Sequence, residues 1–219
     1  MLDSTTIKML LEGIRDTLYM TLGSTFLGYV FGFPMGIILT VTGRDGIRPN
    51  AVIYKIFDVI ANIVRSIPFL ILLILMIPFT RFVVGKSYGS TATIVPLVVC
   101  AAPYIARMVE SSLKEVDSGV IEAARSMGAS DFAIVFRVML VEARTSLIVG
   151  ATIATGVILG YSAMSGTVGG GGLGDIAVRY GYYRWEADMM IITVVLLIIL
   201  FQVFQTIGMK IAGKLDRRK

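Results

Sequence analysis

Five apolar stretches, each long enough to cross a lipid bilayer, dominate this chain of 219 residues. They are residues 18–42, 53–79, 92–109, 146–164 and 189–211. A helix needs about 20 apolar residues to span the hydrocarbon core of a membrane. Because 56% of the residues are hydrophobic and the mean hydropathy is +0.82, we expect an all-α integral membrane protein with five transmembrane helices. The short connections leave no room for a soluble domain, so residues 1–219 are expected to form a single transmembrane domain.

The N-terminal residues do not read as a cleaved signal peptide. Residues 1–16 carry acidic side chains and lack an apolar core that precedes a small-residue cleavage site. Residues 5–16 alternate apolar and polar side chains at helical spacing. We expect this segment to lie along the membrane surface before the first span begins.

The composition excludes several kinds of chemistry. The chain has no histidine and a lone cysteine, Cys100, which excludes intrachain disulfides, imidazole-based catalytic triads and Cys/His metal sites. Gly85-Lys86-Ser87 lacks the glycine that a phosphate-binding loop needs five positions earlier, where Thr80 stands. We therefore expect no ATP site of this type and no metal. The basic excess, 20 residues against 15 acidic ones, is typical of cytoplasmic loops of a membrane protein and does not predict nucleic-acid binding.

Glycines recur in the first stretch. Gly28, Gly32 and Gly36 stand at four-residue intervals and therefore on one helical face. Small residues on one face let two helices pack backbone to backbone. The pattern predicts close packing inside one subunit or, alternatively, a dimer seam.

The second stretch carries polar side chains that membrane spans rarely hold. Asp58, Asn62 and Arg65 stand at i, i+4 and i+7, on one helical face, and prolines at 68 and 78 interrupt the stretch. A charge at membrane depth is costly unless it is paired or faces water. We expect these residues to line a pore or gate, or Asp58 and Arg65 to form an internal tether; the two interpretations are not exclusive.

Residues 118–130 form a polar interval between two spans. Asp117 or Ser118 can cap a short helix, Gly128 can end it in the left-handed conformation, and Ser130 can cap the next helix. The expected inner face of the short helix consists of apolar residues, namely Ala123, Ala124 and Met127. From these residues alone, the interval is either a docking helix for a partner or an ordinary loop helix.

A wider pattern makes the docking interpretation specific. Glu122-Ala123-Ala124 is followed after three residues by Gly128 and, nine residues later, by Val138-Met139-Leu140-Val141. This pattern resembles the cytoplasmic coupling loop of the permease subunits of ABC importers, in which the last four positions begin with Ile and end with Pro. The resemblance implies an ATPase contact made by Glu122, Ala123, Ala124, Met127, Gly128 and Ala129.

Further segments resemble the permease subunits of bacterial methionine importers, which are five-span type I ABC importers. They are RSIPF (65–69) with MIPFTR (76–81), APYIARMVE (102–110), and GYSAMSG (160–166) with GGLG (171–174) and YGY (180–182). The resemblance implies a type I ABC importer permease fold and a homodimer that carries D- or L-methionine. It also implies two ATPase subunits, which bind the ATP and Mg, and a substrate-binding lipoprotein on the outer face.

The fourth stretch ends shortly before a glycine run at residues 169–172, and because glycine disfavours helix we expect this run not to be helical throughout. In a two-fold dimer of the type implied above, Met164 at this end can approach its counterpart. A long, unbranched thioether can then close a narrow pore and repack as helices move. We expect Met164 either to be such a gate or to fill a gap between helices.

Basic residues set the expected orientation. With residues 118–130 in the cytoplasm, thirteen basic residues lie inside: Arg44, Arg48, Lys55, Arg107, Lys114, Arg125, Arg137, Arg144, Lys210, Lys214, Arg217, Arg218 and Lys219. Six lie outside, namely Lys8, Arg15, Arg81, Lys86, Arg179 and Arg184. This asymmetry follows the positive-inside rule. It predicts a multi-pass protein of the bacterial plasma membrane with the N-terminus outside and the C-terminus in the cytoplasm.

Other functions remain open at this point. One is an importer permease for another amino acid or small solute, and another is a passive channel. A membrane-embedded enzyme using Asp58, Arg65 or Glu110 would lack the paired nucleophile and base that such chemistry needs.

Overall fold

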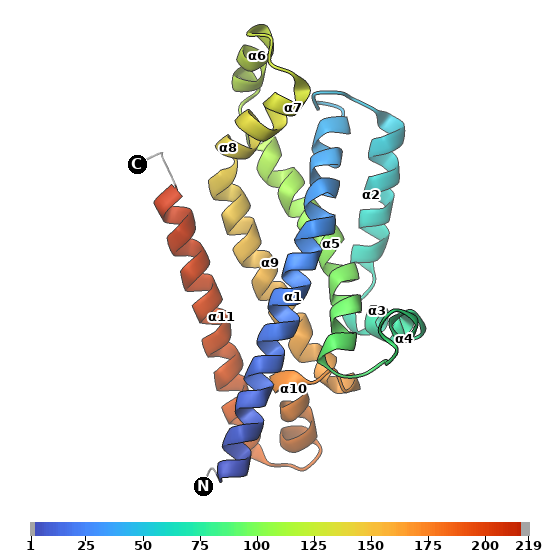
Figure 1. Ribbon diagram of the computed structural model, residues 1–219, viewed down its shortest axis with the longest axis vertical. Coiled ribbons are helices and arrows are strands. Elements are labelled where there is room, and N and C mark those ends of the chain that lie inside the picture. Colours follow the sequence, from blue (N-terminus) through green and yellow to red (C-terminus); the bar gives the residue numbers. More distant parts are fainter. Residues whose placement is uncertain (1–2, 216–219) are drawn as a thin grey trace.

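A computed structural model of the protein describes residues 3–215, and within them every regular element is a helix. The helices α1 (Ser4–Thr42), α2 (Ala51–Ser66), α5 (Ser90–Lys114), α9 (Arg144–Met164) and α11 (Ala187–Leu215) run along the long axis of the molecule (Figure 1). The all-helical class predicted from the sequence is therefore confirmed.

Shorter helices join these five. The helices α3 (Phe69–Leu75) and α4 (Ile77–Val84) lie across the long axis (Figure 1). At the end opposite the N-terminus lie α6 (Ser118–Ser126), α7 (Asp131–Ala133), the π-helical turn η1 (Ile134–Met139) and α8 (Leu140–Glu142). After α9, the chain continues near the N-terminal end through the 3₁₀ turn η2 (Ser165–Val168), α10 (Gly172–Ile176) and the π-helical turn η3 (Ala177–Tyr182).

Four segments of the described chain are long and apolar enough to cross a membrane: α1, α5, the run Arg144–Tyr182 and α11. The helices α2 and α3 meet the same requirement together, but the chain bends by 100° between them. The predicted span 53–79 is therefore a broken one rather than a continuous helix. The break follows from Pro68, which disfavours the helical conformation at the preceding Ile67, whose φ and ψ are −83° and 123°.

Two predicted segments differ from the structure. Residues 5–16 continue α1 without a break instead of forming a separate segment along the membrane surface. They stay in line with the rest of α1 because Leu10 is buried against Leu173 and Ile176 of α10 and Met189 of α11. Residues 80–84, which follow the second predicted span, are also helical: they complete α4, which ends at Gly85 in the left-handed conformation.

Glycines of α1 bring this helix into backbone contact with α5. A Cβ atom at Gly32 would lie 2.4 Å from the carbonyl oxygen of Ala102, and one at Gly36 would lie 2.6 Å from that of Ala106. Gly28 faces the same helix. Because carbon atoms do not approach oxygen this closely, the present separation of α1 and α5 requires glycine at these positions. The pattern serves close packing inside one subunit, which was one of the two predicted roles.

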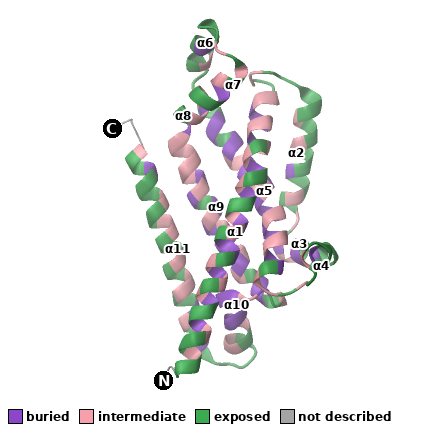
Figure 2. Cartoon of the chain, viewed as in Figure 1, coloured by how far each residue is buried: buried purple, intermediate pink, exposed green. Residues whose placement is uncertain are grey.

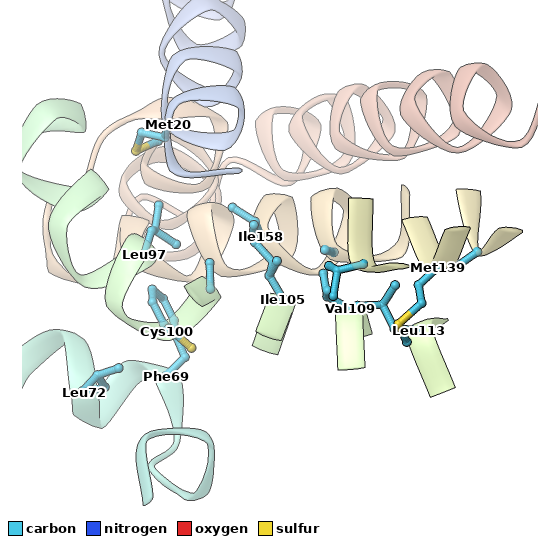
Figure 3. Packing of buried hydrophobic residues seen from close by; sticks show 14 of the residues in the cluster. Met20, Phe69, Leu72, Leu97, Cys100, Ile105, Val109, Leu113, Met139 and Ile158 are labelled. Carbon is cyan, nitrogen blue, oxygen red and sulfur yellow. The ribbon is translucent and has the colours of Figure 1, made fainter. Parts of the chain in front are cut away.

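The main hydrophobic cluster extends along the contact of α1, α5 and α9 (Figures 2 and 3). It runs from Phe69 and Leu97 through Ile105 and Ile158 to Met139 of η1, near α6. In contrast, only 6% of the apolar window of α11 is buried within the protomer (Figure 2). The helix that joins the rest of the bundle is therefore α5, whereas most of the surface of α11 is not covered by other parts of the described chain.

The contact at Gly36 gives a test of this packing. Gly36→Ala should lower the free energy of unfolding by roughly 1–3 kcal/mol, because the added methyl group meets the Ala106 oxygen and Val109. Thermal unfolding in detergent measures the effect. Gly160→Ala in α9 is the matched control, since nothing lies within 4 Å of a Cβ atom there. Equal melting temperatures for the two variants would contradict the packing described.

Candidate functional site

The helix α6 is short and capped at both ends. The Asp117 side chain accepts a hydrogen bond from the Gly119 backbone N–H at 2.6 Å, which caps the N-terminus. At the other end Gly128 has a φ of 81°, and its N–H donates to the Arg125 carbonyl at 2.9 Å. The Ala129 N–H donates to the Ala124 carbonyl at 3.1 Å, which completes a Schellman motif. The predicted caps are confirmed, and they make α6 a stiff unit.

The inner face of α6 differs in part from the expected one. Ala124 is buried, as predicted, but Ala123 and Met127 point outward, and Met127 is 82% exposed. Val120 is also exposed, so Val120, Ala123 and Met127 form an apolar stripe at i, i+3 and i+7. The correction follows from the angle of α6 on its neighbours, where Ile121 occupies the inner position expected for Met127.

The inner side of α6 rests on the turn that leads into α9. Ala124 belongs to the main cluster together with Ile134, Val135 and Met139 of η1. Ser130, as predicted, caps the next helix by accepting from the Ala133 N–H at 3.3 Å. The chain then reaches α9 through η1 and α8 without an extended linker. A force on α6 can therefore reach α9 through packed structure.

A charged cluster joins α2 to α5. Arg107 forms ion pairs with Asp58 and, at 2.7 Å, with Glu110, and it donates a hydrogen bond to Asn62 Oδ1 at 3.1 Å. The Glu110 side chain, only 5% exposed, also pairs with Lys114 at 2.7 Å. Two acids and two bases make the cluster neutral, which lowers the cost of burying each charge.

The predicted tether between Asp58 and Arg65 is therefore wrong, because Asp58 pairs with Arg107 from another helix. Arg65 is exposed, and within residues 3–215 no carboxylate lies within 4.0 Å of it. It stands at the end of α2, beside the break before α3. The sequence did contain a signal for the missed partners: Arg107, Glu110 and Lys114 stand at i, i+3 and i+7, on one face of a helix that continues past the end of the third predicted span.

Met164 ends α9 at the glycine run and is 45% exposed in the protomer. The segment behind it is tightly fitted, because a Cβ atom at Gly174 of α10 would lie 2.0 Å from the Ala163 oxygen. As predicted, the run is not helical throughout: Gly169, Gly170 and Gly171 lie between η2 and α10. Three residues before Met164, the Tyr161 ring stacks on Phe69 of α3 with centroids 4.6 Å apart.

Residues 3–215 contain no group of three or more His, Cys, Asp or Glu side chains that could hold a metal ion. The charged cluster of α2 and α5 is internally paired. The capped helix α6 and the bundle on which it packs are the features that the sequence pattern singled out.

Comparison with known proteins identifies the family. A family model described as the binding-protein-dependent transport system inner membrane component matches residues 32–219. The chain belongs to this family. As a member, it is a multi-pass permease subunit of an inner membrane and not an enzyme.

Named relatives extend this result. The chain is 43% identical over 210 residues to the probable D-methionine transport system permease protein MetI of Vibrio cholerae, covering 96% of this chain and 93% of the relative. It is 52% identical over 158 residues to the D-methionine transport system permease protein MetI of Escherichia coli K12, covering 72% and 73% of the two chains.

Solved structures agree with the fold of this permease. A chain of the MetNI methionine ABC transporter in an inward-facing conformation matches with a TM-score of 0.96 and 48% identity, over 98% of this chain and 100% of that one. An amino acid ABC transporter solved with histidines matches with a TM-score of 0.79 at 19% identity, over 96% and 95% of the two chains. The second match concerns the fold alone. The predicted type I ABC importer permease fold is confirmed.

The charged cluster yields a stability prediction. Glu110→Gln removes the carboxylate shared by Arg107 and Lys114 and should cost roughly 1–3 kcal/mol of folding free energy, because the partly buried Arg107 loses one of its two carboxylate partners. Glu115→Gln is the matched control, since Glu115 is exposed and no ion pair to it is found in the described chain. Thermal unfolding in detergent compares the two. A Glu110→Gln protein as stable as the control would show that the Glu110 ion pairs do not stabilise the fold.

Proposed function

We propose that this permease forms the pathway for D- and L-methionine in an ATP-driven importer of the bacterial plasma membrane. The observation that carries the proposal is the likeness to the permease of the MetNI methionine transporter, over 98% of the chain at 48% identity. The names of the relatives, both D-methionine permeases, support the same substrate.

The proposed assembly is a homodimer with one ATPase subunit under each permease. The outward stripe of α6, formed by Val120, Ala123 and Met127, is apolar and exposed and suits insertion into a groove of the ATPase. Glu122 and Arg125 flank this stripe and can pair with charges at the rim of such a groove. ATP and Mg bind to the ATPase, and a substrate-binding lipoprotein docks at the opposite end of the permease.

The proposed orientation places α6 in the cytoplasm and the N-terminus outside. It is supported by the excess of basic residues in the loops at the α6 end. In Figure 1 the N-terminus lies at the end opposite α6, and α11 runs toward the α6 end. Three of the basic residues behind this assignment, Arg217, Arg218 and Lys219, lie outside the described residues.

Transport follows from relative movement of the two permeases. When the ATPase subunits close on ATP, they carry the two α6 helices toward each other, and each α9 moves with its α6 through η1. The pathway then opens alternately to the outside and to the cytoplasm, so that substrate enters from one side and leaves on the other. Arg65, exposed and at membrane depth, is the residue of the α2 face proposed to line this pathway.

Reconstitution tests the function directly. Proteoliposomes containing the permease, its ATPase and its binding protein should accumulate labelled methionine when ATP is enclosed on the cytoplasmic side. Unlabelled L- and D-methionine should compete, whereas leucine and glutamine should not. Uptake of another amino acid in place of methionine would contradict the substrate, and ATP-independent equilibration would indicate a passive channel.

Gly128→Val tests the role of α6. A β-branched residue is strained at a φ of 81°, by about 1–2 kcal/mol, so the end of α6 should shift and the ATPase contact should weaken. Less ATPase should co-purify, and methionine uptake should fall. Gly128→Asn is the control, because asparagine tolerates this conformation and nothing lies within 4 Å of the added Cβ. Wild-type behaviour of the valine variant in both assays would contradict the assignment.

Met164 is proposed as the gate. Its side chain is half exposed at the end of α9, on a segment that Gly174 holds closely against α10. A two-fold axis passing this end would bring the two Met164 side chains together, where their flexible thioethers can close a narrow opening. The alternative is that Met164 fills a gap between helices.

Met164→Ala should therefore raise the leak of methionine through the permease in the absence of ATP, because a methyl group cannot close the pore. The leak is measured as efflux from preloaded vesicles. Ile153→Ala is the matched control: it is 42% exposed and lies on the same face of α9, about three turns away. An equal leak in the two variants, or no leak in either, would contradict the proposal that Met164 is the gate.

A further inference from the structure

The loop between α1 and α2, residues 43–50, contacts residues 118–131, called here the coupling segment, at two points. Arg48 forms an ion pair with Asp131 at the start of α7. Arg125 of α6 donates a hydrogen bond from Nη2 to the Ile47 carbonyl oxygen at 3.0 Å. The loop is therefore attached to both sides of the turn that ends α6.

This loop is compact rather than slack. The Arg48 N–H donates to the Val41 carbonyl at 3.0 Å, and the Asn50 N–H donates to the Thr42 carbonyl at 2.9 Å. A Cβ atom at Gly46 would lie 2.3 Å from the Val41 oxygen, so the turn closes tightly on the end of α1. Backbone bonds of this kind let the loop transmit displacement instead of absorbing it.

The far side of the loop is the beginning of α2. Asn50 caps this helix, because its Oδ1 accepts hydrogen bonds from the N–H groups of Val52 and Ile53, both at 3.1 Å. The only buried residue of α2 is Ala61, so few apolar contacts fix the helix to the bundle. Its position depends on its two ends and on the Arg107 cluster.

No packed side chains fill the space between α2 and α6. A cavity of about 1130 Å³ lies there, lined by Tyr54, Lys55 and Asp58 on one side and by Ile121, Glu122 and Arg125 on the other. A movement of α6 reaches α2 through the loop that borders this cavity, and not through direct helix packing.

We propose that residues 43–50 are a strut that moves α2 together with the coupling segment, and that Arg48, Asp131 and Arg125 are positioning residues for transport. The proposal rests on the proposed function, in which α6 receives the movement of the ATPase. The strut transmits the movement of α6 to α2, in addition to the transmission through η1 to α9.

Charge reversal at the ion pair tests the strut in the reconstituted transporter. The variants are Arg48→Glu, Asp131→Arg and the exchanged pair carrying both changes. Each single reversal should lower the methionine transported per ATP hydrolysed by about two- to five-fold, the range of a partly exposed ion pair. The exchanged pair should recover most of this ratio, while the amount of ATPase that co-purifies stays unchanged in all three.

Arg44→Glu is the matched control, because it makes the same charge change in the same loop at an exposed residue for which no ion pair is found in residues 3–215. Arg125 is not varied, since it also flanks the face proposed for the ATPase. Single reversals that transport like wild type would overturn the strut. So would an exchanged pair that fails to recover, or a loss of equal size in Arg44→Glu. Absence of ATP-driven uptake in the wild type would instead contradict the proposed function.

Discussion

The close contact of α1 with α5 is the interaction on which the rest of the structure depends. Helices in a bilayer gain little from hydrophobic burial, because lipid tails are as apolar as leucine side chains. Association must come from close packing, and the glycine row of α1 lets its backbone meet the Ala102 and Ala106 carbonyls of α5. With α5 fixed in this way, α9 packs on one side of it and the charged cluster of α2 on the other.

The two sides of α5 are held by different physics. Toward α9 the contact is apolar, through residues such as Ile105 and Ile158. Toward α2 it is ionic, because α2 buries little more than Ala61 and relies on Arg107. A partly buried charge pair is strongly penalised when one partner leaves. The cluster therefore limits how far α2 can separate from α5.

Sequence reasoning succeeded where neighbouring residues alone determine the local structure. The caps Asp117 and Gly128 follow from backbone chemistry alone, and the structure has both. The face of α6 was harder: whether Met127 points inward depends on the angle at which α6 meets η1, which no local spacing encodes. The same holds for Asp58, whose partner Arg107 lies 49 residues away. Local spacing predicted a pairing of Asp58 with Arg65 in the same helix, whereas the structure pairs Asp58 with Arg107 of α5.

The long-range packing also decided where the first helix begins. Residues 5–16 have the alternation of a surface-lying segment, yet Leu10 finds a buried site against α10 and α11. Amphipathicity shows that one face must be covered, but it does not say whether protein or lipid covers it. In this chain the residues that cover Leu10 come from residues 172–189, far along the sequence. The periodicity of residues 5–16 alone therefore could not predict that protein, and not lipid, covers this face.

Two routes lead from α6 to the same point in the membrane. One passes through η1 and along α9 to Tyr161. The other passes through residues 43–50 and α2 to the break at Pro68, after which Phe69 stacks on the same Tyr161 ring, 4.6 Å away. If α9 moved while α2 stayed in place, the stacked rings of Phe69 and Tyr161, near Met164, would have to separate. Moving both helices from one coupling segment keeps the pair in contact, so the end of α9 can be displaced as a rigid body.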